Sequence, residues 1–508
     1  MFKIKSIIIE NKKLLFTLLS SFLIFLSYPK ISLSPLAFLS LIPFIIALFE
    51  FKTKKEAIKY GFIYGFSTYL LLLYWIYPTL RAGEVNPVVS LLGLLFLSAL
   101  LSIEFVVISF VGYMSKTCNI NMTVFVLPSV WVLVDSIKTS LTKYAPYFPW
   151  FQLGYSQWNS PYILNLSHLG QTYTLTFLIV SINVLLASII IEKEKTKKIK
   201  KFIAAVLVLF ISLTLGKMKY DDIEKLLKSS DKKIKIAVIQ PSIDFYMKWD
   251  WSYVDDIKSK IETVLKKATE NDKPDIIIWP ENALYGWIDD NDVFNWLCKN
   301  IKQTNTYHIV GSVSKINRKH VSAYLINPKC EIIAEYDKRI LVPFGEYVPF
   351  RSVIGKFAKV VTALGEFEEG NINQKPFVLN ELKLGQTICY ETIFDYLFYQ
   401  EEDVDLFINI TNDGWYLNTS APYQHFAVSV SRAVSNSRPF IRAANNGISA
   451  FIYPNGKILS ELKLNEYGYI KKEIKLIDIK RQNEIEKNIA IYISLMIITA
   501  FMLAMLFR

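Results

Sequence analysis

Three polar side chains in this sequence follow short apolar runs and could together carry out acyl chemistry. A carboxylate within reach can take the proton of a thiol, and a nearby ammonium favours the thiolate. The same ammonium can stabilise the oxyanion that forms when a thiolate attacks an ester or amide carbonyl. The sequence supplies these types as Glu281 in Trp279-Pro280-Glu281, Lys338 in Tyr336-Asp337-Lys338-Arg339, and Cys389 in Ile388-Cys389-Tyr390-Glu391.

Each of the three residues has a plainer interpretation when it is taken alone. A Cys after a strand is more often a small buried hydrophobe. Lys338 could be a solvated strand end, and Glu281 could cap a turn. Side chains at the ends of several strands can lie together in one site. The three residues together therefore predict a base, an oxyanion stabiliser and a nucleophile.

The elements that must position these residues begin near Lys232, where short β-branched runs alternate with helix-compatible segments. Residues 252–270 have the pattern of an amphipathic helix. Pro454-Asn455-Gly456-Lys457 predicts a hairpin turn. The alternation predicts a layered α/β domain with two sheets covered by helices. The predicted strands are 234–239, 275–279, 308–313, 323–326, 332–336, 382–389, 406–410 and 448–453.

The rest of the chain has the composition of a membrane protein. Of its 508 residues 52% are hydrophobic and only 20% are charged, which is too apolar for an ordinary soluble enzyme. Most of its long apolar stretches approach the roughly 20 residues that cross a bilayer. We predict seven spans in residues 1–217, an outer domain in 218–488 and a last span in 489–508. The stretches are near 14–28, 32–50, 58–80, 87–114, 122–138, 168–191, 202–217 and 489–507.

Lysines predict the orientation of these spans. Alternate loops hold few basic residues, namely Lys30 and then Arg81 beside Glu84. The positive-inside rule therefore places both termini in the cytoplasm and the 218–488 domain outside. The net charge of +12 fits lysine-rich loops and anionic lipid better than nucleic acid, for which no recognition motif is present. The basic loops contain Lys3, Lys5, Lys12, Lys13, Lys52, Lys54, Lys55, Lys59, Lys193, Lys195, Lys197, Lys198, Lys200 and Lys201.

The sequence predicts no cofactor. It has neither a phosphate-binding glycine loop nor a dinucleotide fingerprint. The four histidines are dispersed, so a zinc site is not expected. The cysteines have neither metal-ligand pairing nor the spacing of a disulfide framework; they are Cys118, Cys298, Cys330 and Cys389.

The order and flanks of these motifs resemble the carbon–nitrogen hydrolase (nitrilase) superfamily and, within it, the apolipoprotein N-acyltransferase family. The resemblance spans nearly the whole chain and includes the eight-span layout. It implies a nitrilase-like αββα sandwich in which Glu281 is the general base, Lys338 the oxyanion stabiliser and Cys389 the nucleophile. The further motifs that carry it are Phe148-Pro149-Trp150, residues 341–349, Asn412-Asp413-Gly414-Trp415, Gln424-His425-Phe426 and residues 442–447.

The resemblance also implies supporting residues around the triad. Glu346 would hold Lys338, while Tyr390 and Glu391 would shape the thioester site. Trp249 would lie near the acyl pocket, although ordinary surface packing also explains it. One position departs from the family: Val321 stands where an Asn is usual, which puts one neighbouring contact in doubt.

Two further lipid contacts are expected outside the triad. Trp150, in an aromatic loop, would either join an interfacial belt or shape a lipid pocket. Residues 350–370 would form an arm that touches the bilayer through Phe357 and gates lipid entry, or a helix packed on the domain.

The implied reaction is transfer of an acyl chain from a phospholipid, through a Cys389 thioester, to the amine of a diacylglyceryl-cysteine apolipoprotein. The protein would act as a monomer in the bacterial cytoplasmic membrane. One alternative is a membrane-tethered amidase or nitrilase that passes the acyl group to water. Another is a transporter or scaffold, which is disfavoured because the spans lack paired intramembrane charges, with Glu104 as an exception.

Overall fold

The computed structural model describes residues 2–244, 251–314, 320–349, 367–398, 403–480 and 482–506. The chain forms two compact units. The first contains Met1–Arg81, Val85–Asp222 and Gln482–Arg508, and the second contains Ala82–Glu84 and Ile223–Arg481.

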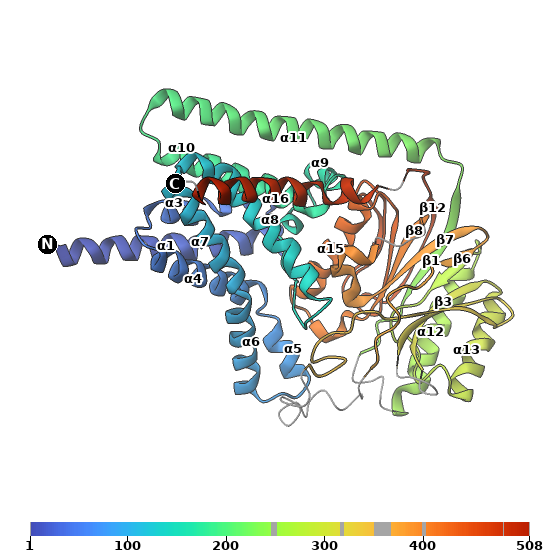
Figure 1. The fold of residues 1–508 in the computed structure, drawn as a ribbon. Coiled ribbons are helices and arrows are strands. Elements are labelled where there is room, and N and C mark those ends of the chain that lie inside the picture. Colours follow the sequence, from blue (N-terminus) through green and yellow to red (C-terminus); the bar gives the residue numbers. More distant parts are fainter. Residues whose placement is uncertain are drawn as a thin grey trace. The chain divides into compact units, whose positions relative to one another are not determined.

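The first unit is built from helices (Figure 1). Among the residues that the structure describes, five helical stretches are long and apolar enough to cross a membrane: Pro87–Cys118, Thr123–Leu141, Gln171–Ile191, Lys195–Ser229 and Glu484–Leu506. The main helices of the unit are α1 (Phe2–Ser27), α3 (Ile42–Glu50), α4 (Lys54–Leu72), α5 (Ile76–Ala82), α6 (Pro87–Leu101), α7 (Ile103–Cys118), α8 (Thr123–Leu141), α10 (Gln171–Ile191), α11 (Lys195–Ser229) and α16 (Glu484–Leu506).

The three remaining predicted spans are also helical, but the apolar part of each is shorter than in the five stretches above. The N-terminal half of α1 contains Glu10, Lys12 and Lys13. The apolar helical stretch Ser34–Glu50, which ends with α3, is only 17 residues long. The first two turns of α4 contain three lysines and Glu56, so its apolar part is short.

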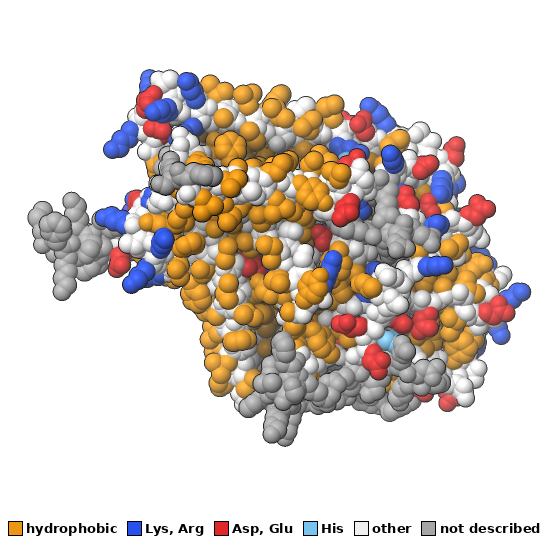
Figure 2. Space-filling model, in the orientation of Figure 1, with side chains coloured by type: hydrophobic (Ala, Val, Ile, Leu, Met, Phe, Trp, Pro, Cys, Tyr) orange, Lys and Arg blue, Asp and Glu red, His pale blue; other side chains and the backbone are white. Residues whose placement is uncertain are grey.

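The surface of the helical unit is suited to lipid. Large apolar side chains on three of its helices are mostly exposed: Phe96 on α6 (71%), Phe210 on α11 (65%) and Met496 on α16 (65%). Figure 2 shows hydrophobic side chains gathered over these helices, with charged side chains concentrated at the helix ends. A membrane-spanning helix has to present such a surface, because lipid offers no partner for polar groups.

The second unit contains two six-stranded sheets (Figure 1). The first has the order β12-β1-β2-β3-β4-β5 and the second has the order β11-β10-β9-β8-β7-β6. The strands are β1 (Lys233–Gln240), β2 (Ile276–Ile278), β3 (Tyr307–Val313), β4 (Val321–Ile326), β5 (Ile332–Asp337), β6 (Phe377–Leu379), β7 (Leu382–Ile388), β8 (Leu406–Thr411), β9 (Phe440–Ala444), β10 (Ser449–Ile452), β11 (Ile458–Leu462) and β12 (Gly468–Lys475).

Helices cover both sheets. On the first sheet, α12 (Val254–Thr269) buries Ile257, Ile261 and Val264, and α13 (Asn291–Thr304) packs in the same core. Their spacing of three to four residues is that of an amphipathic helix face. On the second sheet, α15 (Ala421–Ser435) is buried along nearly its whole length. The predicted α/β domain with two helix-covered sheets is therefore confirmed.

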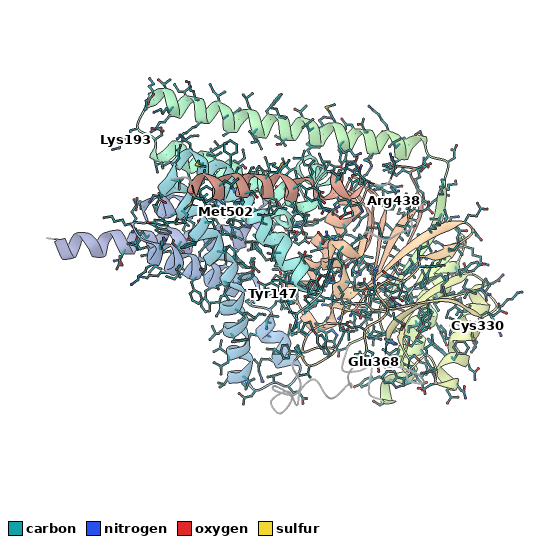
Figure 3. All side chains as sticks on the ribbon, viewed as in Figure 1. Tyr147, Lys193, Cys330, Glu368, Arg438 and Met502 are labelled. Carbon is teal, nitrogen blue, oxygen red and sulfur yellow. A yellow bond between two sulfur atoms is a disulfide. The ribbon has the colours of Figure 1, made fainter. Side chains whose placement is uncertain are left out.

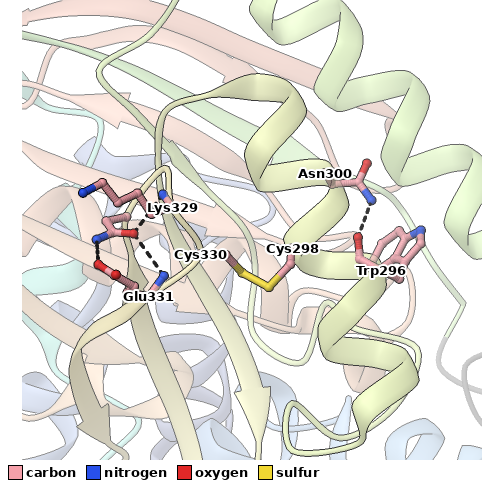
Figure 4. Close-up of a disulfide and its surroundings, with 7 residues drawn as sticks. Trp296, Cys298, Asn300, Lys329, Cys330 and Glu331 are labelled. Atoms are coloured by element: carbon pink, nitrogen blue, oxygen red, sulfur yellow. Dashed lines mark hydrogen bonds between the residues drawn. A yellow bond between two sulfur atoms is a disulfide. The ribbon is translucent and has the colours of Figure 1, made fainter.

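A disulfide joins Cys298 in α13 to Cys330 in the turn between β4 and β5, with Cα atoms 5.3 Å apart (Figure 4). The expectation that the cysteine spacing gives no disulfide is therefore wrong. The two cysteines are 32 residues apart in the sequence, and only the folding of α13 onto the first sheet brings them together. Disulfide formation requires proximity in space, which spacing alone does not reveal.

Candidate active site

The three predicted site residues all lie at carboxyl ends of strands. Glu281 comes shortly after β2, Lys338 directly after β5, and Cys389 directly after β7. In each sheet the central strands run parallel, β1-β2-β3 in one and β7-β8-β9 in the other. Since β5 is separated from β3 by one antiparallel strand, β5 runs in the direction of β3. Glu281 and Lys338 therefore leave the same edge of the first sheet, and Cys389 comes from the second.

The Glu281 carboxylate lies between Lys338 and the second sheet. Its Oε1 accepts a hydrogen bond from Lys338 Nζ at 3.1 Å, and its Oε2 accepts one from the backbone N–H of Asn412 at 3.0 Å. Burial raises the pKa of Glu281 above its usual value, although Lys338 opposes the shift. A carboxylate with a raised pKa is better suited to take up a proton near neutral pH.

A glycine allows this carboxylate to approach. A Cβ added to Gly311 of β3 would lie 2.4 Å from the backbone oxygen of Pro280 and 2.7 Å from Cα of Glu281. A side chain at position 311 would therefore displace the backbone that carries Glu281.

The Lys338 ammonium is fully buried between two carboxylates. Its Nζ lies 3.1 Å from Glu281 Oε1 and 2.5 Å from Glu346 Oε1. Burial alone would lower the pKa of Lys338, but Glu281, Glu346 and Cys389 overcome it and raise the pKa well above its usual value. Lys338 is thus held as a cation, which is the state that can stabilise an oxyanion.

Glu346 is itself held in place. Its second oxygen, Oε2, accepts a hydrogen bond from the backbone N–H of Val342 at 2.8 Å. The structure thus brings Glu346 to Lys338, the contact implied by the family resemblance.

Cys389 lies in a strained turn. Its φ of 50° is in the left-handed region, which is unfavourable for a residue with a Cβ. It is the first residue of a short 3₁₀ helix, η8 (Cys389–Ile393). Sharp, strained turns from a strand into a helix are a known way of presenting a nucleophile.

The surroundings of the Cys389 thiol favour its protonated form. Burial raises its pKa far above the usual range, Glu281 adds to the rise, and Lys338 opposes it. The thiol also forms a hydrogen bond with the side chain of Thr411, which favours the thiolate. A neutral thiol beside a carboxylate with a raised pKa is arranged for proton transfer at the moment of attack.

Tyr390 and Glu391 follow the thiol and are both buried. The Tyr390 ring packs edge-on against Phe394, with ring centroids 4.9 Å apart. The Glu391 carboxylate accepts hydrogen bonds from the backbone N–H groups of Arg339 (2.5 Å) and Ile388 (2.7 Å). The hydroxyl of Tyr336 donates a further hydrogen bond to it at 2.9 Å. Glu391 therefore connects the turn that contains Cys389 to the strand that precedes Lys338.

Three buried polar residues near Cys389 were given no role from the sequence. His425 Nε2 lies 3.0 Å from the backbone oxygen of Cys389, and its Nδ1 lies 3.0 Å from Asp413 Oδ1. Arg442 Nη2 donates to Asp413 Oδ2 at 2.7 Å. All three residues lie in the motifs that resemble the family. Those motifs could therefore have pointed to a role for these residues in the site. Their contact depends on β8, α15 and β9 meeting in the fold.

Trp150 lies in the helical unit and is almost fully buried there. Its ring stacks on Phe148, with centroids 5.5 Å apart, and packs against Trp75 at 5.1 Å. These contacts describe how the aromatic loop packs within its own unit.

Glu104 points into the helical bundle. Tyr69 donates a hydrogen bond to it at 2.6 Å, and Tyr147 (Figure 3) donates one at 2.5 Å. Lys138 Nζ lies 3.3 Å from Glu104 and 2.7 Å from Asp135. The expectation that the spans lack paired charges is therefore wrong. Asp135 and Lys138 are three residues apart in α8, a spacing that the sequence does show, whereas Glu104 lies in α7 and meets Lys138 only through helix packing.

Three remaining predictions have different outcomes. Trp249 and Phe357 lie outside the residues that the structure describes. Val321 is a buried residue of β4, and its backbone oxygen accepts a hydrogen bond from the N–H of Lys338 at 2.8 Å. Position 321 therefore contacts the strand end that carries Lys338 through its backbone, which any residue type can provide.

Comparison with known proteins assigns both parts of the chain. Residues 20–185 match the model of the apolipoprotein N-acyltransferase N-terminal domain, and residues 235–483 match that of the carbon–nitrogen hydrolases. The C. elegans NitFhit protein has a solved structure that is 16% identical with a TM-score of 0.38, covering 48% of this chain and 61% of its own.

Curated relatives extend over most of the sequence. The apolipoprotein N-acyltransferase of Geobacter metallireducens is 29% identical, over 92% of this chain and 90% of its own. That of Rickettsia typhi is 30% identical, over 84% of this chain and 87% of its own. With both family models matched in order and relatives similar over nearly their whole length, this chain belongs to the apolipoprotein N-acyltransferase family.

Proposed function

We propose that this protein moves an acyl chain from a phospholipid to the terminal amine of a diacylglyceryl-cysteine lipoprotein. The observation that carries the mechanism is the contact of the buried Lys338 with Glu281 at 3.1 Å, with both groups acting on the pKa of Cys389. Family membership supports the choice of substrates. All three groups come from one chain, so the reaction requires no second copy.

In the first step, Glu281 takes the proton of Cys389, and the sulfur attacks an ester carbonyl of the phospholipid. The C–S bond forms while the oxyanion is stabilised by the Lys338 ammonium. The ester C–O bond then breaks, and the proton held by Glu281 passes to the leaving lysophospholipid oxygen. The product is an acyl thioester on Cys389.

In the second step, the lipoprotein amine attacks the thioester. The C–N bond forms and Glu281 accepts a proton from the amine. The C–S bond then breaks, and this proton passes from Glu281 to the sulfur, which regenerates the thiol and the carboxylate. No nucleotide is consumed, because the thioester keeps the acyl group reactive. Extraction of a lipid chain into water would cost about 0.8 kcal/mol for each CH₂ group, so an enzyme with membrane-spanning helices avoids a large penalty.

We infer that the second unit faces the outer side of the bacterial cytoplasmic membrane and that both termini lie in the cytoplasm. The lysine-rich loops, including the one with Lys193 (Figure 3), support this orientation through the positive-inside rule. The Cys298–Cys330 disulfide supports it independently, because disulfides persist mainly in oxidising compartments.

Mass spectrometry of the purified protein after incubation with phospholipid tests the mechanism. We expect a mass increase of one acyl group on Cys389, lost in Cys389→Ala and in Glu281→Gln. Addition of a diacylglyceryl-cysteine peptide should discharge the adduct and yield the N-acylated peptide. No adduct with any phospholipid would overturn the proposal. Release of free fatty acid without peptide acylation would instead indicate a hydrolase.

A further inference from the structure

We propose that His425, held by Asp413 and Arg442, is a positioning residue that fixes the peptide between Cys389 and Tyr390 for acyl transfer. These three residues are called the Arg442–Asp413–His425 chain below. The inference rests on the proposed function, because it takes Cys389 as the nucleophile. The proposal assigns a role to three residues that have none in the mechanism of the Glu281, Lys338 and Cys389 triad.

Three side chains donate hydrogen bonds to the backbone oxygen of Cys389. It accepts hydrogen bonds from His425 Nε2 at 3.0 Å, from Thr392 Oγ1 at 3.1 Å and from Asn409 Nδ2 at 3.4 Å. The φ of Cys389 is 50°, so this turn would relax towards a more favourable backbone unless its surroundings held it. Three donors on one carbonyl oxygen supply that restraint.

The position of the imidazole hydrogen follows from its partners. The group opposite Nε2 is a carbonyl oxygen, which cannot donate, so Nε2 carries a hydrogen in both the neutral and the charged imidazole. Nδ1 lies 3.0 Å from Asp413 Oδ1 and 3.1 Å from Arg442 Nη2, so either charge state finds a partner there. The proposed role therefore does not depend on titration of His425.

The far end of the chain is rigid. Arg442 is fully buried and donates to Asn409 Oδ1 at 2.9 Å, to Ser429 Oγ at 3.2 Å and to the backbone oxygen of Ile448 at 3.1 Å. Its Nη2 donates to Asp413 at 2.7 Å, which lowers the pKa of Asp413 to about 2 against the effect of burial. Asp413 thus stays ionised and provides a fixed anchor for the imidazole.

Orientation of this carbonyl also sets the direction of the N–H group of Tyr390. The two groups belong to one planar peptide and point in opposite directions. In strained turns of this kind, the N–H that follows the nucleophile commonly helps to stabilise the oxyanion. Donors on the carbonyl also polarise the peptide and strengthen its N–H as a donor. The Arg442–Asp413–His425 chain would thereby act on the oxyanion without touching the substrate.

A plain packing role is the competing explanation, because His425 lies in α15 and could simply attach this helix to η8. The two explanations differ in the reactions they affect. Thioester formation passes through an oxyanion, whereas alkylation of the thiol by iodoacetamide does not. A packing defect would disturb both reactions, while misorientation of the peptide would slow acylation selectively.

The experiment compares His425→Gln, His425→Asn and His425→Leu in the full-length protein. The glutamine amide nitrogen reaches about as far as Nε2 and keeps the donor, whereas the asparagine amide reaches only the position of Nδ1. We measure acyl-enzyme formation from phospholipid and alkylation of Cys389 by iodoacetamide in each variant. Asparagine and leucine should slow acylation roughly tenfold to a hundredfold, less than the ~10²–10³ lost with a direct oxyanion donor.

The expected pattern is selective. Glutamine should restore acylation to within about threefold of the natural protein, and alkylation should change by less than about twofold in all variants. Natural acylation in His425→Asn, or equal losses in acylation and alkylation, would overturn the inference. The asparagine and glutamine variants decide the matter if the leucine variant does not fold. If the natural protein forms no adduct, the proposed function fails instead.

Discussion

The carboxylate of Glu391 accepts a hydrogen bond from the backbone N–H of Arg339 at 2.5 Å, although the two residues are 52 positions apart. Its other oxygen accepts a hydrogen bond from the backbone N–H of Ile388, at the end of the strand that precedes Cys389. One buried carboxylate thereby fixes the spacing between the Lys338 and Cys389 strand ends. Burial raises the pKa of Glu391, and Arg339 with the backbone donors opposes the rise.

Replacement of this carboxylate by an amide should separate the two strand ends. In Glu391→Gln, the amide NH₂ would face donors on one side, which leaves at least one buried N–H without an acceptor at a cost of about 1–3 kcal/mol. We expect acylation of Cys389 to slow by at least about tenfold and the unfolding temperature to fall. Glu461→Gln, on an exposed position of β11, is the matched control and should change neither. Natural acylation in Glu391→Gln would contradict this role.

Lys338 should control the ionisation of the thiol. Its positive charge opposes the raised pKa of Cys389, so Lys338→Met should raise this pKa further. Since the thiolate is the reactive form, alkylation by iodoacetamide should slow at pH 7–8, and its rise should move to higher pH.

A pH series of alkylation rates measures this shift. Lys329→Met, which removes an exposed lysine from the turn after β4, should leave the profile unchanged. A profile for Lys338→Met that moves to lower pH would show that the ammonium does not stabilise the thiolate.

The disulfide gives a thiol count that can be measured directly. The denatured, unreduced protein should react with two equivalents of alkylating reagent, at Cys118 and Cys389, and with four after reduction. Cys298→Ser should lower the free energy of unfolding by about 4 kcal/mol, because the bond closes a loop of 32 residues. Four reactive thiols without reduction would contradict both the bond and its use as a marker of the outer compartment.

The charged residues in the helical bundle should contribute to stability. Glu104→Gln removes a charged acceptor of the Tyr69 and Tyr147 hydroxyls and one of the two carboxylates beside Lys138, which keeps Asp135 at 2.7 Å. We therefore expect it to cost about 1.5–3 kcal/mol. Tyr147→Phe removes one hydrogen bond to Glu104 and should cost only about 1 kcal/mol. Thermal unfolding in detergent compares the two variants. Equal stability of Glu104→Gln and the natural protein would show that the charge of Glu104 contributes nothing.

Much of this architecture could be predicted because it depends on patterns within short stretches of the sequence. Alternating strands and helices, with polar residues after apolar runs, predicted the two-sheet domain and the places of Glu281, Lys338 and Cys389. The contact of Glu346 with Lys338 followed from the family motif. Each of these features depends on short stretches of sequence or on motif order.

The features that escaped prediction are pairings between distant elements. The Cys298–Cys330 bond, the Glu104–Lys138 pair and the Arg442–Asp413–His425 chain each join residues from different helices or strands. Residue types and spacing give no distance between such elements. The packing of α13 on its sheet, of α7 on α8 and of α15 on β9 supplies that distance.

The pairing of β1 with β12 has a consequence for how the protein is made. These are the first and last strands of their unit, and Lys233 pairs with Lys475. During translation, Glu281, Lys338 and Cys389 are synthesised before β12. The first sheet therefore still lacks a strand when all three residues are already part of the chain. A chain truncated before β12 therefore carries all three residues on an incomplete first sheet.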